Sequence, residues 1–123
     1  MKSKIYNWII LGVFLLASCT KQNEAFFKDK QGNTCDTTSI SFAQSILPVF
    51  QSHCYSCHAN GLNFGNVELQ TYEQIKFQTA QHDLIQVINH ASGFSPMPLG
   101  EPKLSDCDIA KITAWMNAGL PNN

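Results

Sequence analysis

The sequence contains no arginine: all eight basic residues are lysines, against nine acidic residues. A formal net charge of −1 leaves no basic footprint of the kind that nucleic-acid binding requires. Without a guanidinium group, the chain also lacks the usual forked partner for phosphate or carboxylate. Charged residues make up only 14% of the chain and hydrophobic residues 44%, which excludes a disordered protein. One domain with an extension fits the 123 residues.

Long alternating runs of β-branched residues are also absent, so nothing in the sequence suggests a sheet. Apolar residues instead recur at helical spacing over 42–50, although Pro48 should kink or restart that helix. The spacing predicts a weak helix over 71–80 and a stronger one over 83–90. The expected fold class is all-α.

The best-defined helix is expected at the end of the chain, after a loop rich in glycine and proline over 91–103. Ser105 and Asp108 form a capping box at its start, and Gly119 stands at its end. Its apolar face should pack on the helix over 42–50. The residues expected in this contact are Phe42, Ile46, Phe50, Ile112, Trp115 and Leu120.

The first 18 residues have the pattern of an export signal. Lys2 and Lys4 precede an apolar run from Ile9 to Ala17, which is shorter than the roughly 20 residues that span a bilayer. The run ends in Leu16-Ala17-Ser18-Cys19 and resembles the signal of a bacterial lipoprotein. That resemblance implies lipidation of Cys19 and stable membrane anchoring. An ordinary secretory signal with an incidental cysteine is the alternative.

The expected organisation therefore has three parts. Residues 1–18 are expected to be a lipoprotein signal peptide, 19–39 a lipid-anchored flexible tether, and 40–123 the folded domain. The protein should be held by its lipid on the bacterial cell envelope, facing the periplasm or the cell surface. Thiols in such a compartment tend to pair.

Two cysteines followed at once by a histidine form the sequence Cys54-Tyr55-Ser56-Cys57-His58. C-x-x-C-H is the attachment pattern of c-type haem. Thiols at this spacing can add to the two vinyl groups on one side of a porphyrin, and the next histidine then lies under the iron as an axial ligand. The expected cofactor is one covalent haem c with its iron.

Three other uses of these cysteines are open. A thioredoxin-like dithiol would need a βαβ context, which the helical patterns do not provide. A zinc site could combine Cys54 and Cys57 with His53 and His58, although structural zinc sites usually take separated ligand pairs. A structural disulfide between the two cysteines is the third.

The chain resembles the class I cytochromes c, and specifically the small monohaem lipoprotein cytochromes of environmental bacteria. The motif at 54–58 is the specific part of this resemblance, and weaker pieces occur in the family's order. These are Ile46-Leu47-Pro48-Val49-Phe50, Leu69-Gln70-Thr71-Tyr72, Ser95-Pro96-Met97-Pro98 and the helix from Leu104 to Gly119. The resemblance implies about four to five helices packed around one covalently attached haem.

It also implies a monomeric one-electron carrier rather than an enzyme, with redox proteins of a respiratory chain as partners. Members of the family bind the far side of the iron through a methionine sulfur, and the resemblance assigns this role to Met97, which lies between two prolines. Met116 is assigned to the core. A histidine ligand, His82 or His90, is the alternative. A haem-based sensor or small peroxidase with a labile Met97 is the second functional hypothesis, and a zinc-stabilised interaction module the third.

One departure from the family concerns the axial histidine. Many class I cytochromes carry a proline shortly after the motif, whose carbonyl orients the imidazole, but no proline occurs between Ala59 and Tyr72. The ring still needs such a partner. We expect the carbonyl to come from the loop over 62–65.

Cys35 and Cys107 remain once Cys19 is assigned to lipid and the motif pair to haem. In the implied fold the first and last helices cross, so a disulfide between Cys35 and Cys107 is expected in an oxidising compartment. The alternatives are that both stay reduced or that Cys35 pairs between molecules.

Overall fold

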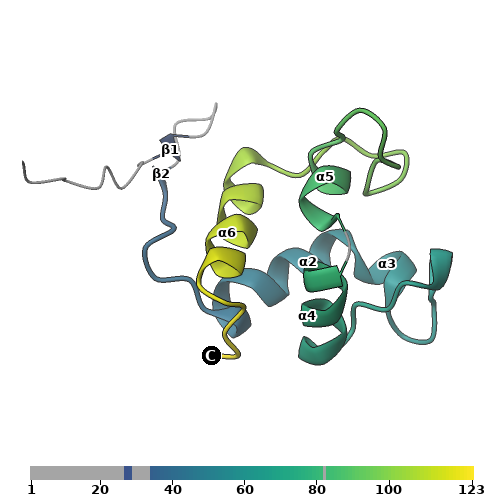
Figure 1. Cartoon of the computed structure of the whole chain (residues 1–123), viewed down its shortest axis with the longest axis horizontal. Coiled ribbons are helices and arrows are strands. Elements are labelled where there is room, and N and C mark those ends of the chain that lie inside the picture. Colours follow the sequence, from purple (N-terminus) through teal and green to yellow (C-terminus); the bar gives the residue numbers. More distant parts are fainter. Residues whose placement is uncertain (1–26, 29–33, 82) are drawn as a thin grey trace, which may run out of the picture.

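A computed structural model describes residues 27–28, 34–81 and 83–123 of the chain, which are helix-rich with almost no strand (Figure 1). The expected signal peptide, the lipidation residue Cys19 and the side chain of His82 lie outside the described residues. The elements in chain order are β1 (Phe27–Lys28), β2 (Thr34–Cys35), the π-helix η2 (Phe42–Ile46), α2 (Leu47–His53), α3 (Tyr55–His58), the 3-10 helix η3 (Phe64–Asn66), α4 (Tyr72–Gln81), α5 (Leu84–Ile88) and α6 (Asp106–Asn117). The all-α prediction is confirmed at this level.

The helix expected over 42–50 changes from a π-helix to an α-helix next to Pro48, where we expect a restart. The π-helix η2 begins after Ser41, whose Oγ accepts a hydrogen bond from the Gln44 amide at 3.4 Å. It gives way to α2 at Leu47, so that Pro48 falls in the first turn of α2. A proline is tolerated there because the amide it lacks would have no intrahelical partner.

α6 begins and ends as its sequence predicts. The Ser105 Oγ accepts from the Asp108 amide at 3.0 Å and donates to the Asp108 carboxylate at 2.7 Å. At the other end, Gly119 adopts φ +85°, and the amide of Leu120 donates to the Trp115 carbonyl at 3.0 Å. Both ends therefore satisfy helix groups that would otherwise lack partners.

The core forms where α6 packs against η2, and buried residues of α2 belong to the same cluster. Trp115 is fully buried and lies beside Phe42, with 5.5 Å between ring centroids, while Tyr72 meets the same phenylalanine edge-on at 5.0 Å. The Trp115 indole donates to the Pro121 carbonyl at 2.9 Å. The expected core residues Phe42, Ile46, Phe50, Ile112 and Trp115 are all buried, and Leu120 packs against them partly exposed.

A disulfide holds the start of the described chain onto α6. Cys35 and Cys107 are bonded with 5.5 Å between their Cα atoms, which is the pairing expected from the sequence. Cys35 belongs to β2, which pairs antiparallel with β1. These contacts fall inside residues 19–39, expected as a flexible tether, so part of that range is paired with the fold. No helix among the described residues is long and apolar enough to cross a membrane.

Candidate haem site

The three residues of the C-x-x-C-H motif lie on one helical turn. Cys54 lies between α2 and α3, and its carbonyl accepts from the amides of Cys57 at 3.1 Å and His58 at 3.0 Å. Both thiols are free; that of Cys54 is partly buried and that of Cys57 is exposed. The two sulfurs and the imidazole are thus presented by a single short element, as attachment to one side of a porphyrin requires.

The Cys54 thiol is held in its protonated form at neutral pH. Burial, and secondarily the neighbouring Cys57, raises its pKa to about 12. Thioether formation adds an S–H bond across a vinyl C=C bond and releases no leaving group. A free, protonated thiol therefore supplies every atom that the addition needs.

His58 is oriented by a backbone carbonyl. Its Nδ1 lies 3.1 Å from the Val67 oxygen, and because a carbonyl can only accept, Nδ1 must carry the hydrogen. The lone pair then resides on Nε2, the atom left to bind a metal. Two residues further on, the Leu69 amide donates to the His58 carbonyl at 2.8 Å. The same loop segment therefore holds both the ring and the backbone of His58.

The carbonyl that orients His58 belongs to Val67, just beyond residues 62–65. The prediction that it would come from 62–65 is wrong. The 3-10 turn η3 explains the difference. The Asn66 amide donates to the Asn63 carbonyl at 2.8 Å, and the Val67 amide to the Phe64 carbonyl at 3.4 Å. Those two oxygens are occupied inside the turn. Val67 follows it in an extended conformation, and its carbonyl reaches the imidazole.

Tyr55, inside the motif, fastens the far end of the same loop. Its hydroxyl donates to the Gln70 carbonyl at 2.8 Å, and the Gln70 side chain accepts from the Asn60 amide at 2.9 Å. Burial and the nearby Cys54 raise the Tyr55 pKa, which keeps the phenol a donor. The two ends of the loop from Asn60 to Gln70 are thus joined to each other, and its far end is joined to the motif through Tyr55.

Replacing Tyr55 with phenylalanine should lower the free energy of unfolding by about 1 kcal/mol, because the half-buried tyrosine loses its hydrogen bond to the Gln70 carbonyl. Urea unfolding of the intact protein measures this change. Ser56→Ala, an exposed change in the same motif, is the control and should shift the unfolding free energy by less than about 0.5 kcal/mol. Equal unfolding midpoints for both variants would show that the Tyr55 hydroxyl does not fasten the loop.

Met97 lies in the loop after α5, and its peptide group is bonded on both sides. Its amide donates to the Val87 carbonyl at 2.9 Å, and its carbonyl lies 3.2 Å from Nε2 of His90. The Met97 side chain is half-buried. In Figure 1 this loop and α3 lie at the same end of the molecule along its longest axis.

Large exposed apolar side chains come from the segments that follow α3 and α5, with one more, Phe77, on α4. Leu62 is 45% exposed, Phe64 61%, Phe94 38% and Leu99 77%. A flat cofactor with two large apolar faces would shield these side chains from water. Together with two free thiols and a free imidazole nitrogen, this donor set fits a haem.

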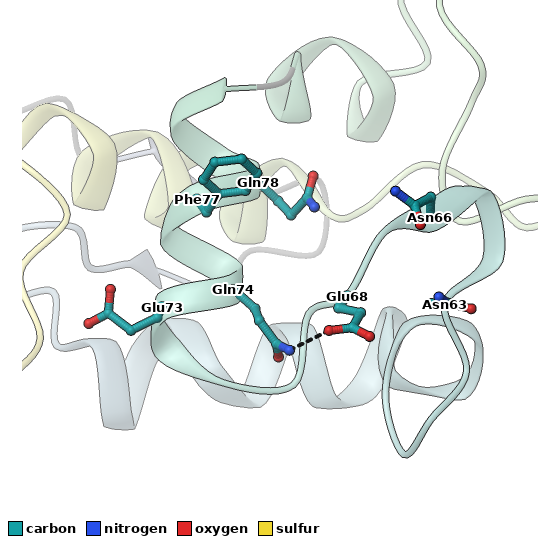
Figure 2. Close-up of a pocket in the computed structure, with 7 residues that line it drawn as sticks. All are labelled: Asn63, Asn66, Glu68, Glu73, Gln74, Phe77 and Gln78. Carbon is teal, nitrogen blue, oxygen red and sulfur yellow. Dashed lines mark hydrogen bonds between the residues drawn. The ribbon is translucent and has the colours of Figure 1, made fainter.

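A polar groove flanks this region, between η3 and α4 (Figure 2). It measures about 480 Å³ and is lined by Asn63, Asn66, Glu68, Glu73, Gln74, Phe77 and Gln78. The Gln74 amide donates to Glu68 at 2.6 Å across it. Glu68 and Gln74 also line a smaller cavity of about 190 Å³ that reaches His58. The polar lining suits water better than a porphyrin face, so we assign no cofactor contact to this groove.

The alternative zinc site is not assembled. Within the described ranges, which include His53, Cys54, Cys57 and His58, no three His, Cys, Asp or Glu side chains come together as a metal-holding group. Cys54 and Cys57 are also not bonded to each other.

Comparisons with known proteins give no relative for this chain. No protein-family model matches it, and neither a curated protein nor a solved structure matches it significantly. Its function must therefore be argued from the site itself.

Proposed function

We propose that this protein is a one-electron carrier with a single covalently bound haem c. One observation carries the proposal: a single helical turn presents two free thiols and an imidazole whose Nδ1 is tied to Val67, leaving Nε2 for a metal. Cys54 and Cys57 would hold the haem through thioethers, with His58 as one axial ligand and Met97 as the other. The haem supplies the electron-accepting iron.

The chain's own residues do the remaining work. Val67 fixes the tautomer and orientation of His58, and the loop between them is closed by Tyr55. Apolar side chains on two loops exclude water from the faces of the group, which affects its redox potential. If His58 and Met97 both bind the iron, no open coordination position would remain for a substrate, which favours a carrier over an enzyme.

The hydrogen bond of His90 favours Met97 as the second axial ligand. Because the Met97 carbonyl can only accept, the His90 Nε2 must carry a hydrogen and has no lone pair for a metal. A His90 ligand that binds through Nε2 would require that contact to break, so the ring as placed could bind only through Nδ1. The methionine sulfur has no such competing role.

The attachment is tested with single-thiol variants. After export in a host that matures c-type cytochromes, the wild-type chain should keep its haem in a denaturing gel, detected by haem-dependent peroxidase staining. Cys54→Ala and Cys57→Ala each remove one attachment point, and the double variant should lose all covalent haem. The matched control is Ser56→Ala, which changes an exposed residue inside the same motif and removes no thiol. Covalent haem in the 54/57 double variant, or none in the wild type, would overturn the proposal.

Location and partners extend the same proposal. The lipoprotein-like signal ending at Cys19 predicts a carrier held on the cell envelope. Such a carrier would exchange electrons with other redox proteins at that membrane. Radiolabelled palmitate incorporated by the wild type and absent from Cys19→Ala is the expected result.

A further inference from the structure

α5 ends in a turn that normally requires glycine. The amide of Ala91 donates to the Gln86 carbonyl at 2.9 Å, and that of His90 to the Val87 carbonyl at 3.2 Å. This pair of bonds defines the Schellman motif, with His90 at the position after the C-cap Asn89. His90 accordingly adopts the left-handed φ of +55°.

The same chain shows the ordinary solution at the end of α6. There Gly119 occupies the equivalent position with φ +85°, and the amides of Gly119 and Leu120 make the corresponding two bonds at 3.0 Å. A side chain with a Cβ is disfavoured in this conformation, and such residues persist where surrounding interactions stabilise them. Backbone preference therefore does not explain a histidine at this position, and the explanation must lie in the contacts of its side chain.

That side chain contacts the proposed second ligand. The Nε2 of His90 donates to the Met97 carbonyl at 3.2 Å, while the Met97 amide donates to the Val87 carbonyl at 2.9 Å. The carbonyl of Val87 thus accepts from both His90 and Met97. The Met97 peptide is held on both sides by the end of one helix, in a loop that has no regular structure of its own.

We propose that His90 is a positioning residue that keeps the Met97 sulfur at its axial position. This inference rests on the proposed function and adds a residue to it. The left-handed turn aims the imidazole back across the loop, and the hydrogen bond restricts movement of Met97 away from the iron. Without the His90 donor, only the hydrogen bond from the Met97 amide to the Val87 carbonyl would hold the backbone of Met97.

The test compares two variants in which the residue at position 90 pays the same free-energy cost for its left-handed backbone conformation. His90→Gln keeps a side-chain nitrogen donor at a similar distance from Cβ, whereas His90→Leu has no donor. Both place a non-glycine residue in the left-handed turn, so a difference between them isolates the hydrogen bond. His53→Leu, which removes an exposed histidine elsewhere, is the control.

The first measurement is carbon monoxide affinity of the reduced, haem-loaded protein, which rises as Met97 leaves the iron. His90→Leu should bind carbon monoxide about tenfold more tightly than the wild type, as expected for loss of one hydrogen bond. His90→Gln should lie within about threefold of the wild type, and His53→Leu should match it. The second measurement is amide hydrogen exchange at Met97, which should speed up about tenfold in His90→Leu only.

The outcomes separate the two proposals. A wild type that carries no haem, or that binds carbon monoxide as readily as Met97→Ala, contradicts the proposed carrier function. A haem-loaded His90→Leu that matches the wild type in both measurements contradicts the role of His90 alone. Equal changes in the leucine and glutamine variants would also contradict it, because they would show that ring packing matters and the donor does not.

Discussion

Replacing Met97 with alanine should lower the midpoint potential of the bound haem by on the order of 0.2 V. A methionine sulfur stabilises ferrous iron, so its loss favours the oxidised state. Water or added ligands could then reach the sixth position, and the reduced protein should bind carbon monoxide readily. Potentiometric titration followed by visible spectroscopy measures the first effect, and carbon monoxide difference spectra measure the second.

Met116 provides a matched control on the same chain. It lies partly exposed on α6, where it packs against the buried core. Met97, by contrast, lies in the loop after α5. Met116→Ala should cost stability but leave the midpoint potential within about 0.03 V of the wild type. If Met97→Ala keeps the wild-type spectrum and potential, Met97 is not the ligand.

Removing the Cys35–Cys107 disulfide should lower the free energy of unfolding by about 4 kcal/mol. The bond joins residues separated by 72 positions, and a loop of this length loses much entropy when it is closed in the unfolded chain. For a small domain this is a large share of total stability. Urea unfolding of the double variant Cys35→Ala with Cys107→Ala, compared with the wild type, measures the difference.

Two further measurements separate the disulfide's effect from that of the substitutions. Reduction of the wild-type protein breaks the bond without changing side chains and should destabilise it to a similar extent. Thiol titration of the unfolded, haem-loaded protein should find no free thiol at Cys35 or Cys107. Two free thiols there, or a loss of stability below about 1 kcal/mol, would contradict the prediction.

Local signals were sufficient to predict most of the helices. The capping box at Ser105 and the glycine at 119 fix both ends of α6, because they act within a few residues of each other. The helix expected over 71–80 is found as α4 (Tyr72–Gln81). The one expected over 83–90 is shorter, since α5 spans only Leu84–Ile88 and then turns at His90. Sequence periodicity could not place that turn, because histidine is not the residue that usually makes it.

The residues proposed to hold the haem were identified from the sequence, but their supporting contacts were not. Cys54, Cys57 and His58 are adjacent in the chain, so their spacing alone implies a common turn. The carbonyl of Val67 and the donor of His90 depend on how two loops fold back. A backbone oxygen carries no sequence signature, and a histidine at a helix end has many possible roles. The Thr71 Oγ accepts from the Gln74 amide at 3.3 Å, a contact that supports the predicted start of α4 and marks the end of the His58 loop.

A reduced-minus-oxidised visible spectrum of the purified, exported protein, together with its iron, zinc and haem content, tests whether the chain is a haem c electron carrier. We expect one covalent haem per chain, one iron, no zinc, and the spectrum of a low-spin haem c with both axial positions filled. A purified protein that holds zinc, or that lacks a low-spin haem c spectrum, would contradict it.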